Sequence, residues 1–216
     1  MTKYVYGESV FVGFVDVLGF RSAMNHRRES RSSGQLIFNL WRNCFLPLRK
    51  RLSTANFVQL SDSLVLYDRS AETVLDLVCD IYGRALVFGV PIRGGLGHGE
   101  LFHLEDHERP GTAITLFGAG QIDAYETEQS AKGCGMRLFL SSSFLSKLTN
   151  PLPDAREHCC GRTEYAWWHR AGIERSHFRE RVDNWWNRKN VREWFRGSHR
   201  IDTERVFKLA LAELSS

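Results

Sequence analysis

Residues 10–20 read VFVGFVDVLGF, an apolar run that reaches a carboxylate at Asp16 and is followed closely by Gly19. The residues before Asp16 are mostly β-branched or aromatic, which is typical of a strand buried on both faces. The sequence therefore predicts a buried strand over 10–15, with an acidic side chain at its C-terminal end.

Helical and extended patterns alternate after this strand. Apolar residues recur at helical spacing over 35–51 and 72–88, which predicts a helix in each segment. Two extended runs, 55–60 and 64–67, flank Ser61-Asp62-Ser63 and predict a tight hairpin. The rest of this part of the chain is expected to form a glycine-rich extended segment (91–102), a helix (118–131), a strand (136–140) and a short helix (142–148).

The predicted order is β-α-β-β-α-β followed by α-β. It is the split βαβ, or ferredoxin-like, pattern of an α+β fold, in which helices pack on one face of an antiparallel sheet. We expect this domain to span residues 1–150. Residues 151–216 hold five of the six tryptophans and many arginines. They are expected to form a mostly helical extension packed on the domain or on a dimer, with a strand at 162–168 and helices at 176–195 and 203–214.

The composition is that of a globular protein. Of the 216 residues, 43% are hydrophobic and 25% are charged, which suffices for a domain with a core. The five cysteines are odd in number and lack C-x-x-C spacing, so we expect reduced thiols and a cytoplasmic location. We expect no signal peptide and no membrane partner, because no run approaches the ~20 apolar residues that cross a bilayer.

Asp16 and Asp62 are the candidate catalytic residues. The split βαβ fold places the first strand beside the following hairpin, so the two carboxylates can converge. Two close carboxylates repel, and a pair of Mg²⁺ or Mn²⁺ ions removes that conflict. Two such ions ~4 Å apart can clamp the attacking and leaving oxygens of an in-line phosphoryl displacement. Taken alone, either aspartate is more simply explained as a helix cap or a turn residue. The assignment as metal ligands therefore depends on the motifs that surround them.

Four motifs resemble those of the class III nucleotidyl cyclases, in the same order and at similar spacing. Residues 14–20 resemble the first metal motif, F-x-D-[IV]-x-G-F, and residues 59–63 (QLSDS) resemble the second metal hairpin. Residues 93–100 (RGGLGHGE) resemble the strand that follows, R-x-G-x-x-x-G-E. Residues 118–128 lie where that family has its dimer-contacting helix.

A finer resemblance is to the short pyrimidine cyclases of bacterial Pycsar anti-phage systems. It rests on Leu18-Gly19-Phe20, Ser61-Asp62-Ser63, Arg93-Gly94-Gly95 and Ala124-Tyr125. The resemblance implies that the protein converts a nucleoside triphosphate into a 3′,5′-cyclic nucleotide and pyrophosphate. It also implies a homodimer with shared active sites and a separate effector that the cyclic nucleotide activates.

The resemblance also assigns roles to individual residues. Asp16, Asp62 and the backbone carbonyl of Val17 would hold two Mn²⁺ or Mg²⁺ ions per site. The backbone of Leu18, Gly19 and Phe20 would cradle the phosphates. The remaining assignments are Arg93 as a catalytic residue and phosphate contact, Arg137 as a phosphate contact, and Ala124 and Tyr125 on the partner side of the site.

The base is expected to be a pyrimidine. Purine cyclases of this class read adenine with a lysine a few residues before the second metal aspartate, and guanine readers generally place a glutamate there. Here that segment is Phe57-Val58-Gln59, which has neither. Phe57 would narrow the pocket and Gln59 could read a smaller ring, although both also suit ordinary strand positions. The choice of UTP over CTP rests on the resemblance.

Three alternatives remain open at this point. The product could be cyclic CMP, or the domain could sense a nucleotide without reacting. The arginine- and tryptophan-rich tail could bind nucleic acid through phosphates and stacking. Its acidic residues make the charge mixed, so we expect a packed appendage and no nucleic-acid partner.

Overall fold

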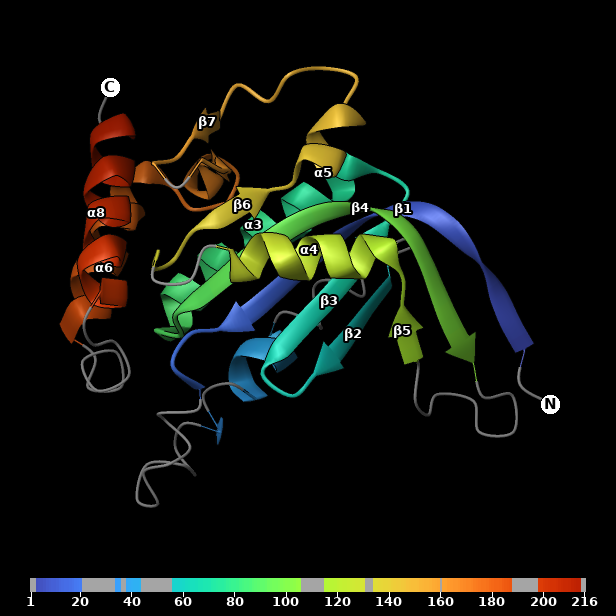
Figure 1. The fold of residues 1–216 in the computed structure, drawn as a ribbon. Coiled ribbons are helices and arrows are strands. Elements are labelled where there is room, and N and C mark those ends of the chain that lie inside the picture. The colour runs from blue at the N-terminus through green and yellow to red at the C-terminus, as the bar shows by residue number, and fades with distance from the viewer. Residues whose placement is uncertain are drawn as a thin grey trace.

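The computed structural model describes residues 3–20, 34–35, 38–43, 56–105, 115–130, 134–159, 161–187 and 198–214. Its strands form one eight-stranded sheet in the order β2-β3-β1-β4-β6-β8-β7, with β5 paired to β4 (Figure 1). The strands are β1 (Lys3–Val17), β2 (Asn56–Leu60), β3 (Ser63–Asp68), β4 (Ile92–Glu105), β5 (Thr115–Phe117), β6 (Leu138–Leu140), β7 (Ala155–Glu157) and β8 (Thr163–Tyr165).

Helices cover both faces of this sheet. They include α3 (Ala71–Phe88), α4 (Ala119–Gln129), α5 (Ser142–Ser146), the 3₁₀ helix η1 (Trp167–His169), α6 (Arg175–Asn187) and α8 (Ser198–Glu213). Among the described strands, every pair is antiparallel except β4 with β6, which is parallel. The α+β fold is thus as predicted, although the sheet is mixed.

The two long central helices lie on opposite faces of the sheet. A Cβ at Gly13 would meet Val78 of α3, whereas one at Gly97 would lie 2.5 Å from the backbone nitrogen of Ala124 in α4. Positions 13 and 97 therefore face opposite sides of the sheet. Figure 1 shows α4 crossing in front of the sheet, with α3 behind it. The prediction that the helices pack on one face is wrong, because the glycine-rich strand β4 opens the second face to α4.

Glycines let α4 lie directly on the sheet. Side chains in a strand alternate between faces, so positions 95, 97 and 99 of β4 point to the same face. A Cβ at Gly99 would be 2.7 Å from the backbone nitrogen of Gly120, closer than packed atoms approach. The glycine-rich segment of the sequence is therefore the strand on which α4 packs. Its glycines are needed because a side chain there would collide with the helix backbone.

Because successive strand side chains lie on opposite faces of the sheet, the hydrophobic core has two parts. The α3-side core contains Val15, Val17, Leu64 and Leu66 with the buried residues of α3. The α4-side cluster consists of Val10, Val12, Phe14, Val65, Tyr67, Leu101 and Ala124. Asp16 follows Phe14 by two residues, so it lies on the α4 face of the sheet.

The chain beyond residue 150 continues the same sheet and core. β8 pairs with β6, and Trp167, Trp168 and Trp185 belong to the α3-side core. The predicted strand at 162–168 is β8 followed by a 3₁₀ helix, and the predicted C-terminal helices correspond to α6 and α8. The division at residue 150 stays a prediction. Parts of the predicted helices 35–51 and 176–195 lie outside the described residues.

Among the residues that the structure describes, no helix is both long enough and apolar enough to cross a membrane.

Candidate active site

The hairpin between β2 and β3 brings Asp62 close to Asp16. Leu60 pairs with Ser63, so Ser61 and Asp62 form the turn, and Ser61 adopts a positive φ of 57°. Ser63 in turn pairs with Asp16 across β3 and β1. The Ser63 hydroxyl donates to Oδ1 of Asp16 at 2.7 Å. Strand register thus brings the turn that holds Asp62 to Asp16, near enough for the Asp62 charge to raise the pKa of Asp16.

The electrostatics of Asp16 suit a cation. Burial raises the pKa of Asp16, and the neighbouring Asp62 carboxylate raises it further. The Ser63 hydrogen bond, the Arg93 charge and the Val17 N–H oppose this shift but do not cancel it. A carboxylate that is buried beside a second one is stabilised in its charged form by a bound divalent ion.

The oxygen atoms of Asp16, Asp62 and Val17 suit Mg²⁺ or Mn²⁺ if the substrate supplies further ligands. The described residues contain no group of three or more His, Cys, Asp or Glu side chains that could hold an ion alone. Two carboxylates with a nearby backbone carbonyl leave positions for water and phosphate oxygens, as Mg²⁺ sites commonly do. Asp16, Asp62 and Val17 therefore stay the proposed metal ligands.

The raised pKa of Asp16 makes stability depend on pH. Because folded Asp16 binds its proton more tightly than in the unfolded chain, its contribution to stability is present below the usual carboxyl pKa and lost as pH rises through the folded pKa. We expect the free energy of unfolding of the metal-free wild type to fall relative to that of Asp16→Asn between about pH 4 and pH 7. Urea unfolding of both proteins across this range measures it. Parallel pH profiles would contradict the raised pKa.

The segment after Asp16 is only partly available to phosphate. The Leu18 side chain is buried, and its N–H donates to the carbonyl of Pro91 at 2.9 Å. Leu18 therefore cannot also offer this N–H to a phosphate, which corrects the prediction for that residue. Gly19 is exposed at φ 77°, and Phe20 packs against the α3-side core. Gly19 is the most exposed residue of the three.

Arg93 lies beside Asp16 but is held by another carboxylate. The two residues are register partners on β4 and β1. The Arg93 guanidinium forms a buried ion pair and hydrogen bond with Glu128 of α4. Burial raises the pKa of Glu128, and Arg93 opposes that shift. The predicted role of Arg93 in contacting phosphate would require this pair to open.

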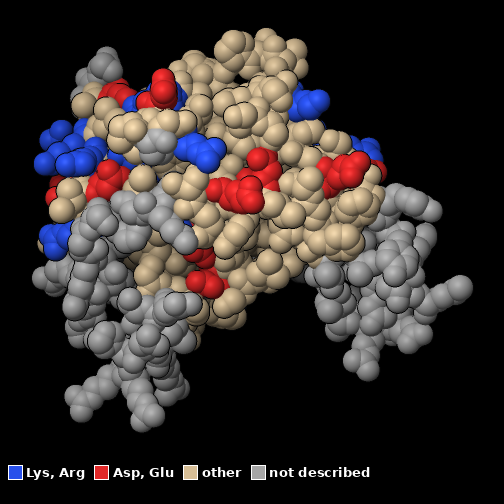
Figure 2. Space-filling view, viewed as in Figure 1, with Lys and Arg blue, Asp and Glu red and all other residues tan. Residues whose placement is uncertain are grey.

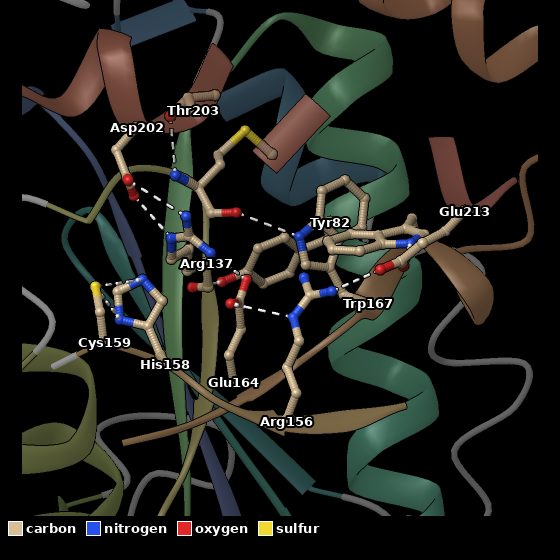
Figure 3. Close-up of polar contacts among 12 residues, drawn as sticks. Tyr82, Arg137, Arg156, His158, Cys159, Glu164, Trp167, Asp202, Thr203 and Glu213 are labelled. Atoms are coloured by element: carbon tan, nitrogen blue, oxygen red, sulfur yellow. Dashed lines mark hydrogen bonds and ion pairs between the residues drawn. The ribbon is translucent and has the colours of Figure 1, made fainter. Parts of the chain in front are cut away.

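Arg137 is part of a buried network that joins β6 to the C-terminal helix (Figure 3). Its Nη1 donates to Glu164 at 2.6 Å, and its Nε donates to Asp202 at 2.7 Å. The neighbouring Met136 N–H donates to the hydroxyl of Thr203 at 3.0 Å. The structure does not favour the predicted phosphate contact, because the guanidinium already serves two carboxylates.

The predicted base readers lie on the other face of the sheet from Asp16. Phe57 pairs with Leu66 and packs against the α3-side core. Gln59 shares that face by alternation, and its Nε2 donates to the carbonyl of Ser61 at 3.2 Å. Within this chain, the structure does not bring Phe57 and Gln59 to the carboxylates. Val58 pairs with Val65 of the α4-side cluster, so it is the residue of the three on the Asp16 face.

Helix α4 presents an uncovered apolar surface. Ala124 is buried against β4, while Tyr125 is 45% exposed and sets its ring edge-on to Phe14. Ile122 of α4 and Phe117 of β5 are also about half exposed. Figure 2 views this face and shows largely uncharged surface with acidic groups near its middle. Exposed apolar area of this kind commonly marks a contact surface.

Sequence reasoning missed Ser63, Val58 and Glu128 as parts of this site. The alternation of strand residues around Asp62 could have placed Val58 on the Asp16 face. The sequence pattern suggested Ser63 as part of the turn and gave no sign of its hydrogen bond to Asp16. Glu128 lies 35 residues from Arg93, and no local pattern connects them.

Comparisons with solved structures identify the fold. The chain is similar to the catalytic core of a rhodopsin-guanylyl cyclase in complex with ATPαS, at 23% identity and TM-score 0.56 over 76% of this chain and 98% of that one. It is also similar to a guanylyl cyclase domain from Blastocladiella emersonii (19%, 0.58, 76% and 97%) and an adenylyl cyclase from P. aeruginosa (13%, 0.56, 75% and 93%). No protein-family model and no curated protein sequence matches. The chain has the class III cyclase catalytic fold.

Proposed function

We propose that the protein is a nucleotidyl cyclase, which converts a nucleoside triphosphate into a 3′,5′-cyclic nucleotide and pyrophosphate. One observation carries this proposal: in a cyclase fold, strand register sets Asp16 beside Ser63, the residue after Asp62, and the Asp62 charge raises the pKa of Asp16. Two Mg²⁺ or Mn²⁺ ions would lower the pKa of the ribose 3′-hydroxyl and neutralise the triphosphate.

In this reaction the ribose O3′ attacks the α-phosphorus, a new P–O bond closes the ring, and the bond to the β-phosphate oxygen breaks. The 3′-hydroxyl loses its proton and pyrophosphate takes the bonding electrons. The chain's contribution is to position its carboxylates, since phosphoryl transfer depends mainly on geometry and charge stabilisation. Ser63 fixes the orientation of Asp16, and Gly19 leaves room for a phosphate beside it.

A homodimer would complete each site. The exposed Tyr125, Ile122 and Phe117 supply an apolar surface on the face that carries Asp16. One similar structure is described as a dimeric guanylyl cyclase domain and another as a complex with GTP. We propose that α4 of each subunit, including Ala124 and Tyr125, contributes to the site of the other.

The proposed substrate is UTP, and its product would be cyclic UMP. The face that bears Asp16 offers Val58 where purine readers carry a lysine or an acid. A purine would leave its polar edge without partners there, which costs binding free energy. The preference for UTP over CTP comes from the resemblance to Pycsar cyclases. The same resemblance supports a cytoplasmic signal generator whose product activates a separate anti-phage effector.

A competition assay tests both levels of this proposal. The protein is incubated with equal concentrations of ATP, GTP, CTP and UTP and with Mn²⁺, and products are identified by mass spectrometry. We expect cyclic UMP as the main product and none from Asp16→Asn. Cyclic CMP would revise the base, cyclic AMP or GMP would refute the pyrimidine assignment, and nucleotide binding without any product would favour a sensor.

A further inference from the structure

Arg93 places a positive charge next to the proposed metal ligand Asp16. The two residues are direct cross-strand partners, whose Cβ atoms lie about 5 Å apart in antiparallel sheets. Both side chains point to the α4 face, because every second residue of a strand lies on the same face and position 93 shares that of positions 95, 97 and 99. An arginine so close to Asp16 could pair with its carboxylate and would repel a divalent cation.

Glu128 engages the Arg93 guanidinium and balances its charge. Its Oε1 accepts from Nε of Arg93 and pairs with Nη2 of the same side chain. Its Oε2 accepts from Nε2 of Gln129 at 2.6 Å. Glu128 is fully buried and Arg93 is 5% exposed, so water does not screen this pair. The hydrogen bonds fix both oxygens of the carboxylate in place.

Helix packing determines where Glu128 stands. The helix α4 is seated on the glycines of β4, and a Cβ at Gly95 would overlap the backbone of Glu128 and Ala124. The close contact between the backbones of α4 and β4 therefore places the Glu128 carboxylate beside Arg93 and restricts its movement. A position this constrained suits a residue that orients a neighbour.

We propose that Glu128 is a positioning residue that orients the Arg93 guanidinium and balances its charge beside Asp16, so that Asp16 stays available to a divalent cation. The inference rests on the proposed function, because it takes Asp16 as a metal ligand. It assigns Arg93 to charge balance inside the subunit and gives Glu128 no contact with substrate.

Binding of Mn²⁺ alone, followed by the EPR signal of the free ion, tests the proposal without turnover. We expect Glu128→Gln to weaken Mn²⁺ binding at least about tenfold, because the Arg93 charge beside Asp16 then loses the carboxylate that balances it. The double variant Arg93→Met/Glu128→Gln removes both charges and is expected to bind within about threefold of wild type, since a buried pair can be replaced by neutral residues.

Folding of each variant is followed by thermal unfolding. If Glu128→Gln does not fold, Glu128→Asp decides, because its shorter side chain keeps the charge but loosens the contact; we expect several-fold weaker Mn²⁺ binding. Wild-type affinity in Glu128→Gln, or in Glu128→Asp where that variant decides, overturns the proposal, as does binding by the double variant as weak as that of Glu128→Gln. Absence of Mn²⁺ binding by the wild type refutes the metal site itself, which distinguishes the two failures.

Discussion

Replacing either Asp16 or Asp62 by asparagine is expected to lower kcat by at least about 1,000-fold, because each carboxylate is proposed to neutralise both ions that activate the 3′-hydroxyl and the triphosphate. Asparagine keeps the size of the side chain, and at position 16 it can still accept the hydrogen bond from Ser63. The substitution also relieves the repulsion between the carboxylates. Initial rates with UTP and Mn²⁺ measure the effect.

A matched control separates this loss from a general effect of charge. Asp183→Asn, at an exposed position of α6, removes the same charge far along the chain and should leave kcat unchanged. Thermal unfolding at neutral pH should show Asp16→Asn to be at least as stable as the wild type. Activity of Asp16→Asn or Asp62→Asn within tenfold of the wild type would refute the assignment.

Mixing two inactive variants is expected to restore activity, if each site uses both subunits. One variant is Asp62→Ala, and the other is Tyr125→Ala, which alters the proposed partner side. Random exchange makes half of the dimers mixed, and one of the two sites in each is intact, so about a quarter of wild-type activity should return. Activity is measured after co-incubation of the purified proteins.

The interpretation of this mixture requires proof that subunits exchange. Each variant carries a different affinity tag, and recovery of both through one tag shows mixed dimers. Each variant alone and a mixture of Asp62→Ala with Asp16→Ala, both on the same side of the site, should stay inactive. A first mixture that stays inactive although mixed dimers are present would refute shared sites.

The pattern of residues 10–20 and the hairpin at 61–63 sufficed to predict the central strand and the hairpin that pairs with it. The register of β2 with β3 is local in its causes, because alternation and a two-residue turn determine it. The pairing of β1 with β3 joins distant residues and follows from the split βαβ topology. The same rule applied to residues 57–59 would have shown that Phe57 and Val58 face opposite sides.

Other features depended on contacts between distant segments. The glycines of β4 suggested close packing, but which face α4 covers follows from their register with β1. Arg93 and Arg137 were predicted to contact phosphate because guanidinium suits it. Their carboxylate partners come from α4, β8 and α8, and no spacing rule links those residues to either arginine.

The network around Arg137 has a consequence for the order in which the chain acquires its structure. Arg137 and Asp202 are 65 residues apart, and Met136 and Thr203 are 67 apart. Closing such long loops is slow, so α8 is expected to dock late in folding. Until it does, Arg137 and the Met136 N–H lack these acceptors, and until β8 pairs, β6 is an open edge. An open edge strand can pair with other chains, so the pairing of β8 with β6 also protects the newly made protein from aggregation.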